Sequence, residues 1–402
     1  MDDDILSQGD DRDPSPWPRR LGVIAAVVAV AVGGIVYLSM PHAHHAASAP
    51  RPTPVSSNPV PAPSPVASPQ FIRVPVGPNG IIGHTTTWED SLRLPVSGTQ
   101  PAWFYPATGR SETIGGLSAN AAGYQFTRVV GGWAVQANET TCGDCDTVPT
   151  PVWFLANGAK SATPVGNANL VAPAADADAL WLTSYFPTAN TATAAGTARE
   201  VSLTGGPLGR SVSLPAGSVI VQATDRGLLL APANQPPGQA VDTLWNPASP
   251  TTSRTFVNVI AASPTEIAWT SSCSPTCRVQ VLDLATGRQT AVSLPTGSSA
   301  AGGAFSPSGQ LLALQVSYSL DGGLAMRLDV ASAASGELTE VPRTSVSSDA
   351  LFAFGWPAQG DSLVAEFTFM PTIQLASWHL GASRLAVSDL KPGHTQASLV
   401  VG

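Results

Sequence analysis

The amino-acid sequence predicts an all-β protein, a single β-propeller of about seven four-stranded blades, preceded by one transmembrane helix. Three observations lead to this fold class. Glycine and proline each occur 37 times in 402 residues and only 11% of the chain is charged, which indicates many turns. From about residue 77 the chain repeats a unit of roughly 45 residues, giving about seven units, with six or eight as alternatives. An uncharged apolar stretch precedes the repeats.

The chain begins with a short polar tail followed by this apolar stretch. Residues 1–20 are acidic and end in Arg19 and Arg20, and Leu21 to Leu38 are eighteen residues without a charge. At about 1.5 Å per residue, the stretch makes roughly 27 Å of helix, enough for a thin hydrocarbon core. Because basic residues mark the cytoplasmic side, the tail is expected in the cytoplasm and the rest of the chain outside.

The alternative to an uncleaved signal anchor over residues 21–39 is a cleaved secretory signal. Ala47, Ser48 and Ala49 have the small-x-small form of a cleavage site, although Pro50 disfavours cleavage directly before it. An anchor gives a single-pass protein of the cell membrane, whereas cleavage near Ser48 or Ala49 gives a secreted protein. Both outcomes place the repeats outside the cytoplasm.

Residues 40–76 form a linker between the anchor and the repeats. Ten prolines lie between positions 41 and 75, separated mainly by alanine, serine and valine. Such a composition favours extended polyproline II structure. We therefore expect a semi-rigid stalk that holds a propeller ectodomain, residues 77–402, away from the membrane.

The repeats share a turn, usually with glycine, that recurs every 38 to 49 residues, near Gly109, Gly158, Gly206, Ser249, Gly287, Gly336 and Gly381. Each unit holds three or four short runs rich in Val, Leu, Trp and Thr, which indicates short β-strands. One such sheet cannot cover both of its faces, whereas a ring of sheets buries each face against a neighbour. Tryptophans recur at equivalent strand positions and are expected to pack between blades: Trp103, Trp133, Trp153, Trp181 and Trp269.

One unit carries a recognisable motif. Residues 306–313 read Ser-Pro-Ser-Gly-Gln-Leu-Leu-Ala, and residues 283–287 of the preceding unit read Asp-Leu-Ala-Thr-Gly. These stretches resemble the TolB-type and WD-repeat β-propeller superfamily, whose blades have a Ser-Pro-Asp-Gly turn before an aliphatic strand and a later Asp with a Thr-Gly turn. Here Ser308 replaces the Asp of the first turn, and no blade ends in Trp-Asp. The resemblance implies a propeller but no particular partner. Seventeen arginines against two lysines are typical of a high-GC, actinobacterial-like genome.

The four cysteines form two close pairs, Cys142 with Cys145 and Cys273 with Cys277. Each pair follows a tryptophan-containing strand and precedes the strand ahead of a glycine turn, so the pairs are expected in the same loop of blades 2 and 5. A shared zinc site would need these loops to meet, which equivalent loops of a seven-bladed ring do not do. A thioredoxin-like role needs a helix after the first cysteine, and none is expected. We predict one disulfide in each loop, in keeping with an oxidising exterior.

Composition and motifs favour binding over catalysis. A net charge of −8 argues against nucleic acid as a partner. The sequence lacks Gly-x-Ser-x-Gly, phosphate-loop, dinucleotide-binding and His-Glu-x-x-His motifs, so no catalytic residue, metal or cofactor is predicted. We predict a membrane-tethered extracytoplasmic module that binds a protein, peptide or cell-envelope ligand. The alternatives are a glycan hydrolase or lyase, with two carboxyls about 5–10 Å apart at the central channel, and a passive sensory ectodomain.

Overall fold

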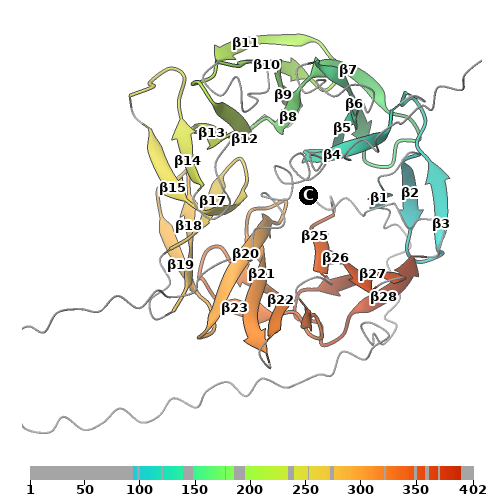
Figure 1. Ribbon diagram of the computed structural model, residues 1–402, viewed down its shortest axis with the longest axis vertical. Coiled ribbons are helices and arrows are strands. Elements are labelled where there is room, and N and C mark those ends of the chain that lie inside the picture. The colour runs from blue at the N-terminus through green and yellow to red at the C-terminus, as the bar shows by residue number, and fades with distance from the viewer. Residues whose placement is uncertain are drawn as a thin grey trace, which may run out of the picture.

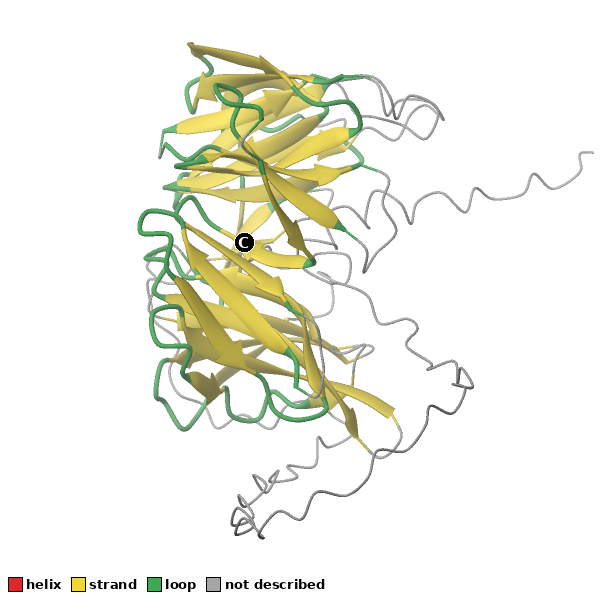
Figure 2. Cartoon of the chain, turned by 90° about the vertical axis from the view of Figure 1, so that its left-hand side faces the viewer, coloured by secondary structure: helices red, strands yellow, loops and turns green. Residues whose placement is uncertain are grey.

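The computed structural model describes residues 94–390, except 97–99, 119–120, 139–147, 177, 185–194, 234–239, 252, 272–275, 321–322, 348–350, 358–361 and 370–371. This part of the chain forms seven β-sheets arranged as a ring around a central axis (Figure 1). Figure 2 shows the ring from the side, with many of the tight turns along its left edge. The predicted all-β, seven-bladed propeller is confirmed.

Each sheet consists of strands that are consecutive in the chain and pair antiparallel with their sequence neighbours. Blade 1 consists of β1 (Leu94–Val96), β2 (Ala102–Tyr105) and β3 (Arg110–Thr113). Blade 2 consists of β4 (Gly123–Val129), β5 (Gly132–Asn138), β6 (Thr150–Ala156) and β7 (Thr163–Ala168). Blade 3 consists of β8 (Leu170–Pro173), β9 (Ala179–Thr183), β10 (Thr197–Ser202) and β11 (Pro207–Ser213). Blade 4 consists of β12 (Ser218–Thr224), β13 (Gly227–Pro232), β14 (Val241–Trp245) and β15 (Arg254–Val257). Blade 5 consists of β16 (Val259–Ala262), β17 (Glu266–Thr270), β18 (Arg278–Asp283) and β19 (Gln289–Ser293).

The last two blades follow the same order. Blade 6 consists of β20 (Ser298–Phe305), β21 (Leu311–Leu320), β22 (Gly323–Ser332), β23 (Leu338–Glu340) and β24 (Val346–Ser347). Blade 7 consists of β25 (Leu351–Gly355), β26 (Ser362–Phe369), β27 (Thr372–His379) and β28 (Ala386–Leu390). In blade 6 the outer strand is divided, because β23 pairs with one end of β22 and β24 with the other.

The turns that define the sequence repeat all join the third and fourth strands of a blade. In blade 1, where three strands are described, the turn at Gly109 lies between β2 and β3, so β1 corresponds to the second strand of the other blades. In blade 5, the carboxylate of Asp283 accepts hydrogen bonds from the backbone N–H groups of Ala285 and Thr286 at 2.9 and 3.1 Å. Gly287 follows with φ of +73°, a conformation that glycine adopts readily.

Tryptophan side chains fill the spaces between blades, as predicted. Trp103 of blade 1 is 2% exposed and lies in one apolar cluster with Trp133 and Trp153 of blade 2. Its indole N–H donates a hydrogen bond across the joint to the carbonyl of Ala159 at 2.7 Å. Trp181 belongs to the cluster between blades 3 and 4. Burial of such large side chains on both faces of each sheet holds neighbouring blades together.

The ring closes by packing between its first and last blades. Leu94 and Phe104 of blade 1 share an apolar cluster with Val364, Leu375 and Ala386 of blade 7. These residues are between 0% and 5% exposed. The closing joint is therefore an apolar interface of the same kind as the joints between the other blades.

The first strands of blades 2, 3, 4, 6 and 7 lie nearest the ring axis (Figure 1), and β16, the first strand of blade 5, lies beside β20. Four of these strands carry one extra residue relative to the second strand, at Val221 of β12, Ile260 of β16, Ala301 of β20 and Phe352 of β25. Such bulges bend a strand and increase its twist. Their recurrence in blades 4 to 7 was not evident in the sequence repeat.

Candidate functional site

The two cysteine loops occupy equivalent positions in the ring. The segment with Cys142 and Cys145 joins β5 to β6 in blade 2, and the segment with Cys273 and Cys277 joins β17 to β18 in blade 5. Cys277 is 9% exposed and is disulfide-bonded. The other three cysteines lie outside the described residues, so the pairing within each loop stays a prediction.

The residues of the predicted membrane anchor also lie outside the described part of the chain. These are Arg19, Arg20, Leu21 and Leu38, together with the stalk of residues 40–76. Within the described residues, no helix has the length and apolar character needed to cross a membrane. The anchor, the stalk and the extracytoplasmic location therefore stay predictions.

A glycan hydrolase would need a pair of carboxylates near the central channel, so the side chains of the innermost strands test that alternative. Among the described residues of β4, β8, β12, β16, β20 and β25, the ionisable side chains are Tyr124 and Arg128, with no Asp, Glu or His. In the described part of the chain, no group of three or more His, Cys, Asp or Glu side chains is placed to hold a metal. The described residues of these six strands therefore do not supply such a pair.

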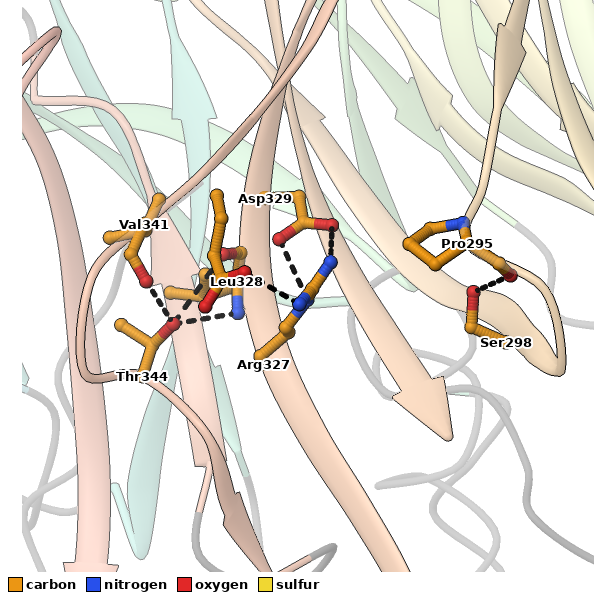
Figure 3. A network of polar contacts seen from close by, with 8 residues as sticks. Pro295, Ser298, Arg327, Leu328, Asp329, Val341 and Thr344 are labelled. Carbon is orange, nitrogen blue, oxygen red and sulfur yellow. Dashed lines mark hydrogen bonds and ion pairs between the residues drawn. The ribbon is translucent and has the colours of Figure 1, made fainter. Parts of the chain in front are cut away.

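A buried charge cluster lies on blade 6, which the sequence analysis did not identify (Figure 3). The guanidinium of Arg327 contacts both carboxylate oxygens of Asp329 at 3.0 Å and donates to Glu340 at 2.7 Å. Arg327 is 6% exposed and Asp329 is 0% exposed. In the strand register these two residues lie opposite Val316 and Leu314, which pack against blade 5. The cluster therefore sits between blades 5 and 6.

Burial dominates the titration of Asp329. It raises the pKa of this carboxyl to about 6, and the neighbouring Arg327 lowers the pKa by less than burial raises it. A second hydrogen-bond centre lies at the outer edge of the same sheet, in the gap between β23 and β24. There Thr344 accepts a hydrogen bond from the backbone N–H of Leu328 at 3.0 Å and donates one to the carbonyl of Val341 at 2.8 Å (Figure 3). Thr344 thereby fixes the loop between β23 and β24, and both centres are structural.

Blade 3 contains a similar arrangement. Glu200 is 2% exposed and forms an ion pair with Arg210, which also pairs with the exposed Asp176. Burial raises the pKa of Glu200, and Arg210 opposes this shift. In both blades, one guanidinium joins a buried carboxylate to an exposed one, which satisfies a charge that would otherwise be costly to bury.

Asp242 is a buried carboxylate between blades 4 and 5. It is 6% exposed and lies opposite Phe256, whose ring packs edge-on against Trp269 at 5.0 Å. Burial raises the pKa of Asp242 to about 6, while a hydrogen bond with the backbone of Val259 lowers it by less. Because the carboxylate is almost fully enclosed, it supports the joint between the blades and is not positioned to meet a ligand.

The connections between strands differ in length on the two faces of the ring. We call the face where second strands lead into third strands the upper face, and the opposite one the lower face. The two longest connections, residues 139–149 and 184–196, are eleven and thirteen residues long and belong to the upper face. On the lower face most connections have two to six residues, the exception being residues 246–253. Long loops on a rigid scaffold commonly carry binding residues.

Exposed apolar side chains are present on both faces. Val148 lies in the upper connection before β6, and Val257 and Leu320 lie at the upper ends of β15 and β21; they are 49%, 50% and 42% exposed. Val130 and Leu380 lie in lower-face turns and are 55% and 53% exposed. Single exposed apolar residues are ordinary on protein surfaces. These five positions therefore mark the two faces without identifying a site.

No protein-family profile and no curated protein matches the chain. Among solved structures, a prolyl endopeptidase aligns with a TM-score of 0.50 at 11% identity, over 76% of this chain and 49% of its own. The chain thus spans about half the length of that enzyme. The β-propeller domain of the Trilobed protease from Pyrococcus furiosus aligns at 0.46, with 10% identity over 73% and 86% of the two chains. A TolB structure from Agrobacterium tumefaciens aligns at 0.37, with 10% identity over 75% and 89%. At such low identity, the likeness to the prolyl endopeptidase shows a shared fold alone.

Proposed function

We propose that the protein is an extracytoplasmic binding module that recognises a protein, peptide or cell-envelope component on the upper face of its ring. The observation that carries this proposal is the concentration of long connections on that face, including both cysteine-containing loops. Seven sheets with tight lower turns form a rigid base, and rigidity of the base lowers the entropy lost when loops engage a ligand.

The tether is part of the proposal and rests on the sequence. An apolar segment over residues 21–39 and a proline-rich stalk over residues 40–76 would hold the ring outside the cytoplasmic membrane. Sequencing the N-terminus of the exported protein tests this arrangement. An intact N-terminus in the membrane fraction supports the anchor, and a mature start near Ala49 replaces it with a secreted protein.

Site-specific photo-crosslinking tests the choice of face. A benzophenone amino acid would replace Val148, Val257 or Leu320 on the upper face, and Val130 or Leu380 on the lower face, in the full chain expressed in its own host. The lower-face positions serve as controls, because their side chains are at least as exposed as those of the upper-face positions. We expect crosslinked adducts to a cell-envelope component from the upper positions only.

Three outcomes contradict the proposal. Adducts of equal yield from both faces indicate non-specific encounters, and adducts confined to the lower face place the partner on the opposite side. If purified chain instead releases reducing ends from envelope glycans, the hydrolase alternative takes the place of a binding module.

A further inference from the structure

Arg128 stands apart from the other arginines that are partly buried. It lies on the innermost strand β4, directly opposite Trp133 on β5, and its guanidinium stacks over the indole ring at 4.8 Å. By strand alternation it shares the face of Tyr124 and Phe126, which pack toward blade 1. A guanidinium over an aromatic face keeps its N–H groups available as donors.

Among the described residues, the buried Arg327 has acceptors, and so do the exposed Arg210 and Arg226. Arg327 and Arg210 each contact two carboxylates, and Arg226 donates to the carbonyls of Leu284 and Ala285 at 3.0 Å. Within the part of the chain that the structure describes, Arg128 makes its stacking contact and has no hydrogen bond or ion pair. A partly buried guanidinium with five donors and no acceptor is unfavourable until an anion supplies one.

We propose that Arg128 is the anchor of an anion-binding site between blades 1 and 2, which takes a pair of oxygens from a carboxylate or a phosphate. Both groups present two oxygens at the spacing of the guanidinium fork, which is why arginine binds them in a bidentate manner. The site lies near the turn between β4 and β5, at the lower end of β4. It is therefore separate from the upper face and goes beyond the proposed function.

The surroundings support the same ligand chemistry. Burial alone lowers the pKa of Arg128 to about 10, with no nearby carboxylate acting to raise it. The described innermost strands carry no acidic side chain that would repel an anion. Arg128 therefore remains fully charged at neutral pH and is the one cation on those strands.

Thermal unfolding of the purified full chain in detergent tests the site. Sodium phosphate and sodium acetate would each be titrated against sodium chloride at equal ionic strength, which separates specific anion binding from screening. We expect a saturable rise in Tm of about 3 °C when the bound anion reaches about ten times its Kd. The two arms show whether the site prefers phosphate or carboxylate.

Variants assign the effect to Arg128. We expect Arg128→Gln to abolish the anion-dependent rise, and Arg128→Lys to weaken it about tenfold because the fork is lost. The matched control is Arg254→Gln, because Arg254 also stacks on aromatic rings, at 5.1 Å from Phe256 and 5.8 Å from Trp269, but is exposed on an outer strand. This control is expected to keep the full rise. The proposal is overturned if neither anion raises the Tm of the unsubstituted chain more than chloride does, or if Arg254→Gln loses the rise as well.

Discussion

The charge cluster between blades 5 and 6 allows a double-mutant experiment, in which the expected changes in the free energy of unfolding follow from the geometry of the cluster. Arg327→Met keeps the length of the side chain but removes its contacts with the carboxylate oxygens of Asp329 and Glu340. Asp329, which is fully buried, would then be left without a counter-charge. Removing one partner of a buried pair costs about 3–5 kcal/mol, because the remaining charge stays desolvated.

The double variant Arg327→Met with Asp329→Leu removes both charges and fills the space with apolar atoms. Replacing a whole buried pair in this way is often neutral, so we expect the double variant to be at least about 2 kcal/mol more stable than Arg327→Met alone. The exposed Glu340 loses its partner in both variants and is re-solvated at little cost.

The assay is urea unfolding of the detergent-solubilised chain at pH 7.5, followed by tryptophan fluorescence. A loss below about 1 kcal/mol for Arg327→Met would show that the pair is not desolvated as described. A double variant that is less stable than Arg327→Met would refute the argument that the unpaired Asp329 charge causes the loss.

Two further predictions concern the joints between blades. Burial raises the pKa of Asp242 from 3.8 to about 6, so the folded state binds this proton more tightly than the unfolded state does. The resulting contribution to the free energy of unfolding is fully present below about pH 4 and is lost as the pH rises through 6. We expect the free energy of unfolding of Asp242→Asn, measured relative to that of the unsubstituted chain, to increase by up to about 3 kcal/mol from pH 4 to pH 7.5. The same difference in free energy between the two chains at both pH values would contradict this expectation. Trp356 is 2% exposed, and its indole N–H donates to the carbonyl of Ala304 across the joint of blades 6 and 7 at 3.0 Å. Trp356→Phe is expected to cost about 1–3 kcal/mol in urea unfolding, whereas the same change at the partly exposed Trp245 should cost less than about 1 kcal/mol.

The fold could be predicted from the sequence because its signals are local. A turn such as that at Gly287 needs only the backbone freedom of glycine and an Asp four residues earlier, and both are visible in the chain. The tryptophan positions follow from alternation within short strands. The equivalence of the two cysteine loops followed from the same counting of strands and turns.

The charged residues could not be assigned in the same way, because their roles depend on pairing between strands. Arg327 and Asp329 are two residues apart in a mainly apolar strand, a pattern that signals a buried ion pair. That Glu340 joins them depends on the register of β22 with β23. Arg128 contacts the ring of Trp133 because a two-residue turn places them opposite each other, and that it has no acceptor among the described residues is a property of the folded ring.

The way the blades are built has a consequence for how the chain folds. Apart from β24, which pairs with β22, every described strand pairs with a strand that directly precedes or follows it, so each blade can form from a stretch of roughly 45 residues with little loop-closure entropy. The contact between Leu94 and Phe104 of blade 1 and Ala386 of blade 7 joins the two ends of the described chain. This joint can form only after the last blade has been synthesised. A substitution there would open the ring while leaving every sheet intact, so we expect such variants to expose apolar faces and associate with one another instead of unfolding completely.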